Sequence, residues 1–153
     1  MGVKIRFKKD GYIQSIGILL YKDGTHKFIS PPIPNGVDVL KDPHNYMEFY
    51  YKSLKEICHK TKPIAIAVIS ESYAVDNDDL TKEDLEDMIR ENGGSLEGLP
   101  GIKDLAVINF ETTLTREAIT FEIDRQKKTL TNQKRSSEVT GFFTGILNNI
   151  NYN

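Results

Sequence analysis

Cysteine is nearly absent from this chain, which has a single one, Cys58, among its 153 residues. No disulfide can form within the chain, and we expect an intracellular protein or one that does not depend on disulfides. Cys58 follows Ile57 in a helical pattern, which predicts a buried and inert thiol. The neighbouring His59 would not activate it, because adjacent residues on a helix do not face each other.

Excess positive charge and long apolar runs are also lacking. The formal net charge is -2 and the pI is about 5.9, whereas a protein dedicated to duplex nucleic acid usually has a basic excess. The longest apolar runs, such as residues 63–69, are far too short to cross a bilayer. No apolar core follows the first charged residues, so we expect no signal peptide. These features predict a cytoplasmic protein without a duplex nucleic-acid or membrane partner.

Recognisable catalytic motifs are missing as well. The three histidines are His26, His44 and His59. They lack the i, i+4 spacing of zinc ligands on one helix. Ser70 is not in a Gly-x-Ser-x-Gly elbow, and the glycine-rich segment 93–101 lacks the Gly-Lys-Ser/Thr ending of a phosphate loop. No His-x-Thr or His-x-Ser pair occurs, which excludes a two-histidine phosphoesterase. We therefore predict no catalytic residue, cofactor or metal site, and favour a protein that is not an enzyme.

The first thirty residues alternate apolar and polar side chains, which predicts a β-meander. We expect its strands at residues 3–7, 12–21 and 25–30. Asp-Gly pairs at residues 10–11 and 23–24 separate them, and Asp-Gly between strands is a strong hairpin signal. The proline-rich segment 31–36 is expected to connect the sheet to a helix, although it could also be a ligand for another domain.

Two helices are predicted with defined ends. The first begins with Asp42 as a cap and Pro43 at its first position, and Pro63 stops it. The second covers residues 81–92, where Thr81 and Asp84 form a weak capping box. The acidic residues just before it are therefore interpreted as a helix start. A calcium loop is excluded, because a loop beginning at Asp76 would lack the required glycine and glutamate.

Three further segments complete the predicted sheet. Residues 63–75 are apolar on both faces as far as Ile69, which is typical of a central strand. Residues 104–113 and 116–125 alternate and predict an antiparallel hairpin with one solvated side. The basic segment 125–138 could be a mobile loop or a strand extension. Residues 139–150 have helical spacing of apolar residues but two glycines, so a helix or a strand is possible.

The fold class that follows is α+β. We predict a single domain over residues 1–153, with a mostly antiparallel sheet, an N-terminal β-meander and two or three packed helices.

Four carboxylates are candidates for a catalytic metal site: Glu71, Glu111, Glu122 and Asp124. On one face of the sheet they could bind Mg²⁺, as a metal-dependent phosphohydrolase or nuclease requires. Alternation, however, groups Glu71 with an apolar face and the hairpin acids with a polar one, so the two sets could point to opposite sides. The alternative interpretation is a solvated sheet face.

A basic stretch is the candidate ligand site: Lys127, Lys128, Lys134 and Arg135. Together with an aromatic ring such as Tyr73, these cations could hold a phosphate-bearing ligand. The alternative interpretation is a solvated polar loop. The apolar segment 141–147 suits an interface between copies of the chain, and we expect a homo-oligomer.

The sequence AIAVISESYAV at residues 65–75, together with DLAVINFETTLTREAITFEI at residues 104–123, resembles small proteins of phages and prophages. In those proteins a strand with a Ser-Glu-aromatic centre precedes a strand hairpin. The resemblance covers roughly the central third of the chain. It implies a cytoplasmic phage accessory protein, one that could counter a host system, and it assigns no activity to any residue.

Three functional hypotheses follow from these patterns. The first is a non-enzymatic binding protein that captures a phosphate-bearing small ligand or a host protein. The second is a magnesium-dependent phosphohydrolase or nuclease that uses the four carboxylates. The third is a structural virion or scaffold protein.

Overall fold

A computed structural model describes residue 11, residues 13–31, 43–75 and 79–94, residue 99, and residues 101–137 and 143–152. The side chains of residues 43–46, 73 and 75 are not part of this description. The predicted strand at residues 3–7, the Asp42 cap and most of the proline-rich segment lie outside the described residues.

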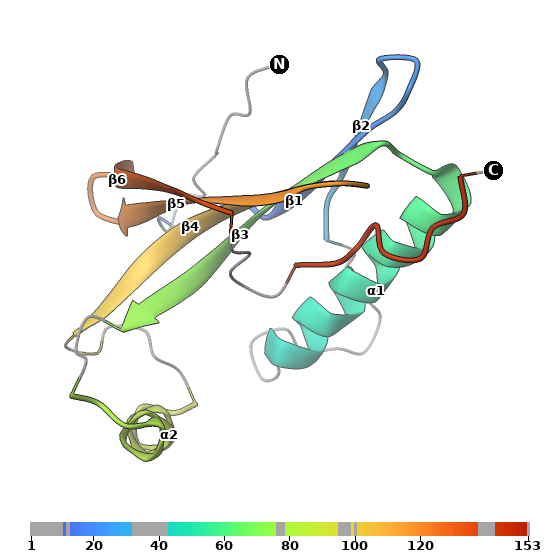
Figure 1. Cartoon of the computed structure of the whole chain (residues 1–153). Helices are drawn as coiled ribbons and strands as arrows, with labels where there is room; N and C mark the ends of the chain where they lie inside the picture. Colours follow the sequence, from blue (N-terminus) through green and yellow to red (C-terminus); the bar gives the residue numbers. More distant parts are fainter. Residues whose placement is uncertain are drawn as a thin grey trace.

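An antiparallel sheet of six strands forms the centre of the described structure, in the order β2-β1-β3-β4-β5-β6 (Figure 1). The strands are β1 (Ile16–Leu20), β2 (His26–Ile29), β3 (Ala65–Val75), β4 (Ile102–Thr112), β5 (Arg116–Asp124) and β6 (Thr129–Ser136). The predicted α+β fold class is confirmed, because two helices accompany this sheet in the described part of the chain. The central position predicted for β3 is confirmed, because β1 and β4 pair with its two edges.

The Asp-Gly turn at residues 23–24 forms the β1–β2 hairpin as predicted. The Asp23 carboxylate accepts hydrogen bonds from the backbone N–H and the hydroxyl of Thr25, at 2.9 and 2.6 Å. Gly24 has a φ of +86°, a conformation that glycine adopts without steric cost. The short local contacts of this turn explain why the sequence pattern was sufficient to locate it.

The basic segment after β5 is ordered as strand β6, so the strand extension is the correct alternative. β6 pairs with β5, with a shift in register between Thr120 and Glu122 that marks a β-bulge. Asn132 lies at this irregularity with a φ of +53°. A bulge adds residues to one strand and bends it, which is why this polar strand carries no regular alternation in its sequence.

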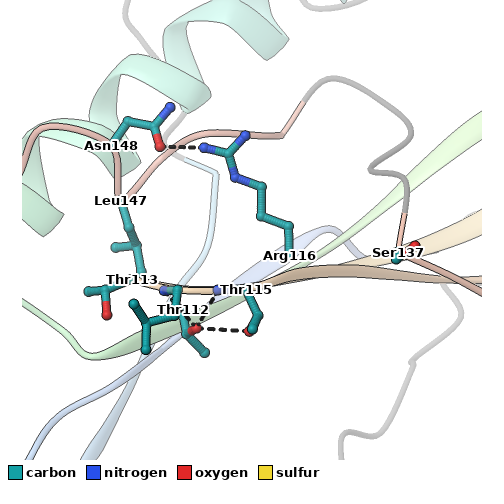
Figure 2. Close-up of a pocket in the computed structure, with 8 residues that line it drawn as sticks. Thr112, Thr113, Thr115, Arg116, Ser137, Leu147 and Asn148 are labelled. Carbon is teal, nitrogen blue, oxygen red and sulfur yellow. Dashed lines mark hydrogen bonds between the residues drawn. The ribbon is translucent and has the colours of Figure 1, made fainter.

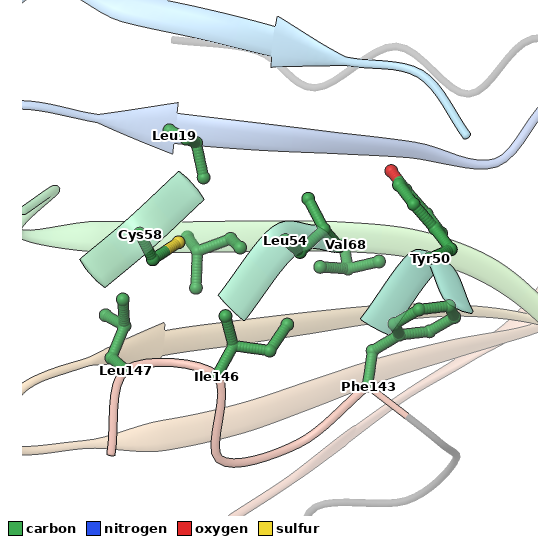
Figure 3. Packing of buried hydrophobic residues seen from close by; sticks show 9 residues of the cluster. Leu19, Tyr50, Leu54, Cys58, Val68, Phe143, Ile146 and Leu147 are labelled. Carbon is green, nitrogen blue, oxygen red and sulfur yellow. The ribbon is translucent and has the colours of Figure 1, made fainter. Parts of the chain in front are cut away.

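Helix α1 (Pro43–Thr61) packs on one face of the sheet, which we call the helix face (Figure 1). Its buried side chains Tyr50, Leu54 and Cys58 join Leu19 of β1 and Val68 of β3 in one core cluster (Figure 3). The predicted burial of Cys58 is confirmed. The helix is 19 residues long, and no helix among the described residues is both long and apolar enough to cross a membrane.

Helix α2 (Lys82–Glu91) begins with the predicted capping box. The Thr81 hydroxyl accepts from the N–H of Asp84 at 3.1 Å, and the Asp84 carboxylate accepts from the N–H of Thr81 at 3.0 Å. None of its residues is buried, and it lies beyond the ends of β3 and β4 (Figure 1). Helix α2 is therefore held mainly by local contacts and, contrary to the prediction of packed helices, adds nothing to the core.

The C-terminal segment, residues 143–152, is neither the helix nor the strand that its spacing suggested. Residues 146–149 form a turn, and Gly145 has a φ of +71°. Phe143, Ile146 and Leu147 nevertheless lie in the core cluster beneath α1 (Figure 3). The segment 141–147 was predicted to pack against another copy of the chain, but its described apolar side chains are buried in the chain's own core.

The opposite face of the sheet holds a second core cluster. Its buried members are Ile13, Ile18, Ala67, Ile69, Ala106, Ile108 and Ile119. Ala67 and Ile69 alternate along β3 with Ile66 and Val68, which belong to the first cluster. Both faces of β3 are thus buried, as its continuous apolar run predicted.

Candidate functional site

The four candidate carboxylates lie on both faces of the sheet. In the β3–β4 ladder Glu111 is paired with Ile66, whose side chain lies in the core on the helix face. Directly paired residues share a face, so Glu111 is on the helix face, whereas Glu71 follows Ala67 and Ile69 on the opposite one. The β4–β5 register places Glu122 on the helix face with Glu111. The strand registers therefore separate Glu71 from the hairpin acids.

Glu71 belongs to an ion cluster around Arg125. The guanidinium donates to both Glu71 oxygens at 3.0 Å and to Asp104 at 2.9 Å, and Glu71 also accepts the backbone N–H of Ile13. Burial by itself would lower the pKa of Arg125, but its bonds and charge contacts with Glu71 and Asp104 outweigh this and raise it. Glu71 thus serves to attach the chain near Ile13 to the sheet, which accounts for an acid at the end of an apolar strand.

Glu111 is a buried carboxylate that holds the C-terminal segment. Its two oxygens accept the backbone N–H groups of Ile146 and Leu147 at 3.0 and 3.1 Å. The Nε of Arg116 lies 3.7 Å away. Only 5% of Glu111 is exposed. These donors therefore replace the hydrogen bonds to water that the carboxylate loses on burial.

The other two acids have local partners. Glu122 forms an ion pair with Lys103 at 2.7 Å and accepts from Asn132, and the hydrogen bond from Lys103 lowers its pKa. Asp124 accepts the backbone N–H of Lys127 at 3.0 Å in the turn after β5. In the described part of the chain no three His, Cys, Asp or Glu residues are grouped to hold a metal ion. The alternative hypothesis of one magnesium site formed by the four acids does not agree with these positions, because Glu71 lies on the face opposite Glu111 and Glu122.

The predicted phosphate site is also dispersed. Lys127 and Lys128 lie in the turn at one end of β5 and β6, whereas Lys134 and Arg135 are neighbours on β6 and point to opposite faces. Arg135 pairs with Glu117 at 3.2 Å. Tyr73 is in β3, separated from β6 by β4 and β5. The structure does not bring these five residues together, although Lys134 shares the helix face with Glu111.

A pocket of about 500 Å³, which we call the hairpin pocket, lies at the end of the β4–β5 hairpin, against the C-terminal segment (Figure 2). Its lining residues are Thr112, Thr113, Leu114, Thr115, Arg116, Ser137, Leu147 and Asn148. Pockets of several hundred Å³ are the usual size of small-molecule sites. The lining is mostly polar and contains a single charge, that of Arg116.

Arg116 extends from the start of β5 toward the turn at Asn148 (Figure 2). Its Nη2 donates to the Asn148 side-chain oxygen, and its Nε lies near Glu111. A guanidinium has five N–H donors, and within the described structure these two residues are its partners. Several donors are therefore left for a ligand, and 41% of the side chain is exposed to receive one.

The hairpin turn fixes the threonines of the pocket. The Thr112 hydroxyl oxygen accepts from the N–H groups of Leu114 and Thr115, at 3.2 and 3.0 Å, and bonds the Thr115 hydroxyl at 2.9 Å. These bonds hold the turn rigid and set the direction in which Arg116 leaves it. The hydroxyls of Thr113 and Ser137 add polar groups to the wall of the pocket.

Sequence reasoning missed this pocket. Residues 112–116 were predicted only as a hairpin turn. Ser137 and Asn148 come from segments whose predicted structure was left open between two alternatives. The one available signal was an arginine at the end of the sequence Thr-Thr-Leu-Thr-Arg, which is too common to indicate a site. The pocket exists because the buried Glu111 holds the turn at Ile146 and Leu147 beside the hairpin.

Asn109 is a buried polar residue on the helix face. It is only 3% exposed, and neither polar atom of its side chain has a hydrogen-bond partner among the described residues. In the β3–β4 ladder it is paired with Val68 of the core. A buried amide of this kind is usually satisfied by an internal water molecule.

Comparison of the chain with protein-family models, with curated proteins and with solved structures found no match.

Proposed function

We propose that the protein is a non-enzymatic binding protein that captures a small phosphate-bearing ligand in the hairpin pocket. The observation that supports this is Arg116, the single charged group of the pocket, with unused donors among hydroxyl side chains and no carboxylate in the lining. An arginine fork matches the oxygens of a phosphate group, and charge-assisted bonds of this type are the strong ones.

The composition of the lining favours a phosphate monoester over a bare cation or an apolar molecule. Hydroxyl and amide groups from Thr113, Ser137 and Asn148 can bond both phosphate oxygens and the hydroxyls of an attached sugar. The carboxylate of Glu111 offsets part of the charge of Arg116, but its oxygens are already occupied by two backbone donors. Arg116 therefore remains the cation that an incoming anion meets.

The proposed ligand is still phosphate-bearing, but its site is the hairpin pocket and not the basic stretch. Lys127 and Lys128 lie beyond the end of β5 that is opposite Arg116, about eight residues and some 25 Å of strand away. A triple substitution of Lys127, Lys128 and Arg135 by Ala is therefore expected to leave binding at the hairpin pocket unchanged. Loss of binding in that variant would assign the ligand to the basic stretch instead.

The direct test is isothermal titration calorimetry with ribose 5-phosphate, with ribose as the ligand that lacks only the phosphate. We expect binding of ribose 5-phosphate alone, weakened about tenfold to a hundredfold by Arg116→Gln, since each charge-assisted hydrogen bond contributes about 1.5–3 kcal/mol. Arg135→Gln is the matched control, because Arg135 is an exposed arginine paired with Glu117.

Arg116 also contacts Glu111 and Asn148, so a second variant separates binding from folding. Arg116→Lys keeps the charge but loses the planar fork, and it should bind more weakly than the wild type with little change in melting temperature. Equal binding of ribose and ribose 5-phosphate, or wild-type affinity in both Arg116 variants, would refute the proposal.

We further propose a phage accessory role and capture of a host protein. A phage accessory role rests on the resemblance of residues 65–75 and 104–123, and capture of a host protein has no described pocket of its own to support it. For a homo-oligomer the expected packing surface was residues 141–147, and of these Phe143, Ile146 and Leu147 are buried in the chain's own core. Native mass spectrometry of the protein purified from the cells that produce it would measure subunit number and any retained small molecule together.

A further inference from the structure

Three exposed apolar side chains lie at the end of the sheet that carries the hairpin pocket. Among the described residues the exposed large apolar side chains are Phe28, Phe49, Ile64, Leu114 and Tyr152. Leu114, at the tip of the β4–β5 turn, is 92% exposed and also lines the pocket. A single exposed leucine would be ordinary, but several exposed apolar side chains grouped at one place mark a candidate contact surface.

The other two residues at this end are placed by hydrogen bonds and register. Ala65 pairs with Thr112, so Ile64, one residue earlier, lies beside the start of the turn that carries Leu114. The Tyr152 hydroxyl donates to the carbonyl of Pro63 at 2.6 Å. Ile64 and Tyr152 are 39% and 40% exposed. We call Ile64, Leu114 and Tyr152 the apolar rim.

A polar pocket with one cation beside an apolar rim suits a ligand that has a polar, anionic part and an apolar part. We propose that the ligand is a nucleoside monophosphate, with its phosphate on Arg116, its sugar among the pocket hydroxyls and its base on the apolar rim. This inference rests on the proposed function, because it extends the same site. Bases pack on aromatic and apolar side chains through their flat faces, with little dependence on sequence or ring type.

The side chain of Leu114 and the exposed part of the Tyr152 ring are available for contact. Leu114 lies on a tip whose backbone is held by Thr112, so removing its side chain leaves the turn bonds intact. The Tyr152 hydroxyl is already used by Pro63, which leaves the exposed part of its ring as a surface. Burial raises the pKa of this hydroxyl, so it remains a donor across the neutral range.

The test compares AMP with ribose 5-phosphate by isothermal titration calorimetry, since the two ligands differ only in the base. We expect AMP to bind at least about tenfold more tightly than ribose 5-phosphate. Leu114→Ser should bring the ratio of the AMP affinity to the ribose 5-phosphate affinity, measured in the same variant, close to one. Phe28→Ser is the matched control, because Phe28 is also an exposed apolar residue but lies on the edge strand β2.

The outcomes separate this inference from the proposed function. Equal affinity for AMP and ribose 5-phosphate, or an AMP affinity that Leu114→Ser does not change, would overturn the nucleotide inference and leave phosphate capture standing. Failure of the wild-type protein to bind either compound would overturn both. A selective loss of AMP affinity in Leu114→Ser, with Phe28→Ser unaffected, would establish the rim as the base contact.

Discussion

Replacing Glu111 by Gln should destabilise the protein through the C-terminal segment. Glu111 is the same size as Gln, so the change removes the charge without leaving a cavity. In the wild type the carboxylate accepts two backbone N–H groups, from Ile146 at 3.0 Å and Leu147 at 3.1 Å. The Gln amide offers one oxygen and one NH₂ group, so one of these backbone donors would face another donor and lose its partner.

The magnitude follows from the two bonds. One becomes a neutral hydrogen bond and loses about half of its strength. The other is lost and leaves a buried N–H unsatisfied, which costs about 1–3 kcal/mol. The Arg116 contact adds little, because that side chain is partly exposed and 3.7 Å away. We expect the free energy of unfolding to fall by about 2–4 kcal/mol, or on the order of 10 °C in melting temperature for a domain of this size.

Chemical denaturation of the Glu111→Gln variant, with Glu117→Gln as the control, would measure this fall in the free energy of unfolding. Glu117 makes the same type of ion pair with Arg135, but both side chains are largely exposed, at 43% and 68%. Its change should therefore stay within about 0.5 kcal/mol. Hydrogen exchange should also accelerate at the amides of Ile146 and Leu147. If Glu111→Gln is as mild as the control, the buried carboxylate does not hold the segment and the reasoning is refuted.

Two further predictions concern buried charge and the buried thiol. In a double-mutant cycle of Glu71→Gln and Arg125→Met, the coupling measured by denaturation should be about 1–3 kcal/mol, because both partners are about four-fifths buried. A coupling as small as that of the exposed Glu117–Arg135 pair would contradict this. Burial, with a smaller contribution from the charge of Glu111, raises the pKa of Cys58 to about 12, so thiol reagents at pH 8 should label it only in denaturant. Because the folded pKa exceeds the unfolded value of about 8.5, stability should fall as the pH rises between these values; rapid labelling of the native protein would contradict the assigned burial.

The features that sequence reasoning predicted correctly depend on contacts between near neighbours. The capping box of α2 joins Thr81 and Asp84, three residues apart. The turn at Asp23 and Gly24 is closed by bonds within five residues. Alternation likewise located β4 and β5. The prediction that one side of this hairpin is solvated is wrong in part, because Asn109, Glu111 and Ala118 lie on that side and are buried. Local rules of this kind predicted most of the strands and both helices.

The candidate sites could not be predicted in the same way, because they depend on register between strands. Alternation showed that Glu71 belongs to an apolar face, but only the pairing of Ile66 with Glu111 places the two acids on opposite sides. A shift of one residue in that register would have reversed the result. The partner of Glu71, Arg125, is 54 residues away in the chain.

The sequence by itself therefore determined strands β1 to β5, the two helices and the burial of Cys58, since each follows from periodicity, a turn or a cap within a few residues. It left open whether the basic segment that forms β6 is a strand. Tertiary structure alone decided the C-terminal segment and the pocket. The spacing of Phe143, Ile146 and Leu147 suits a helix, but two backbone donors in this segment bind the buried Glu111, and φ at Gly145 is +71°. That turn brings Asn148 to Arg116 and closes one side of the pocket. A side chain buried 35 residues away in sequence outweighed the local preference, because an unsatisfied carboxylate in the core costs more than a lost helical turn.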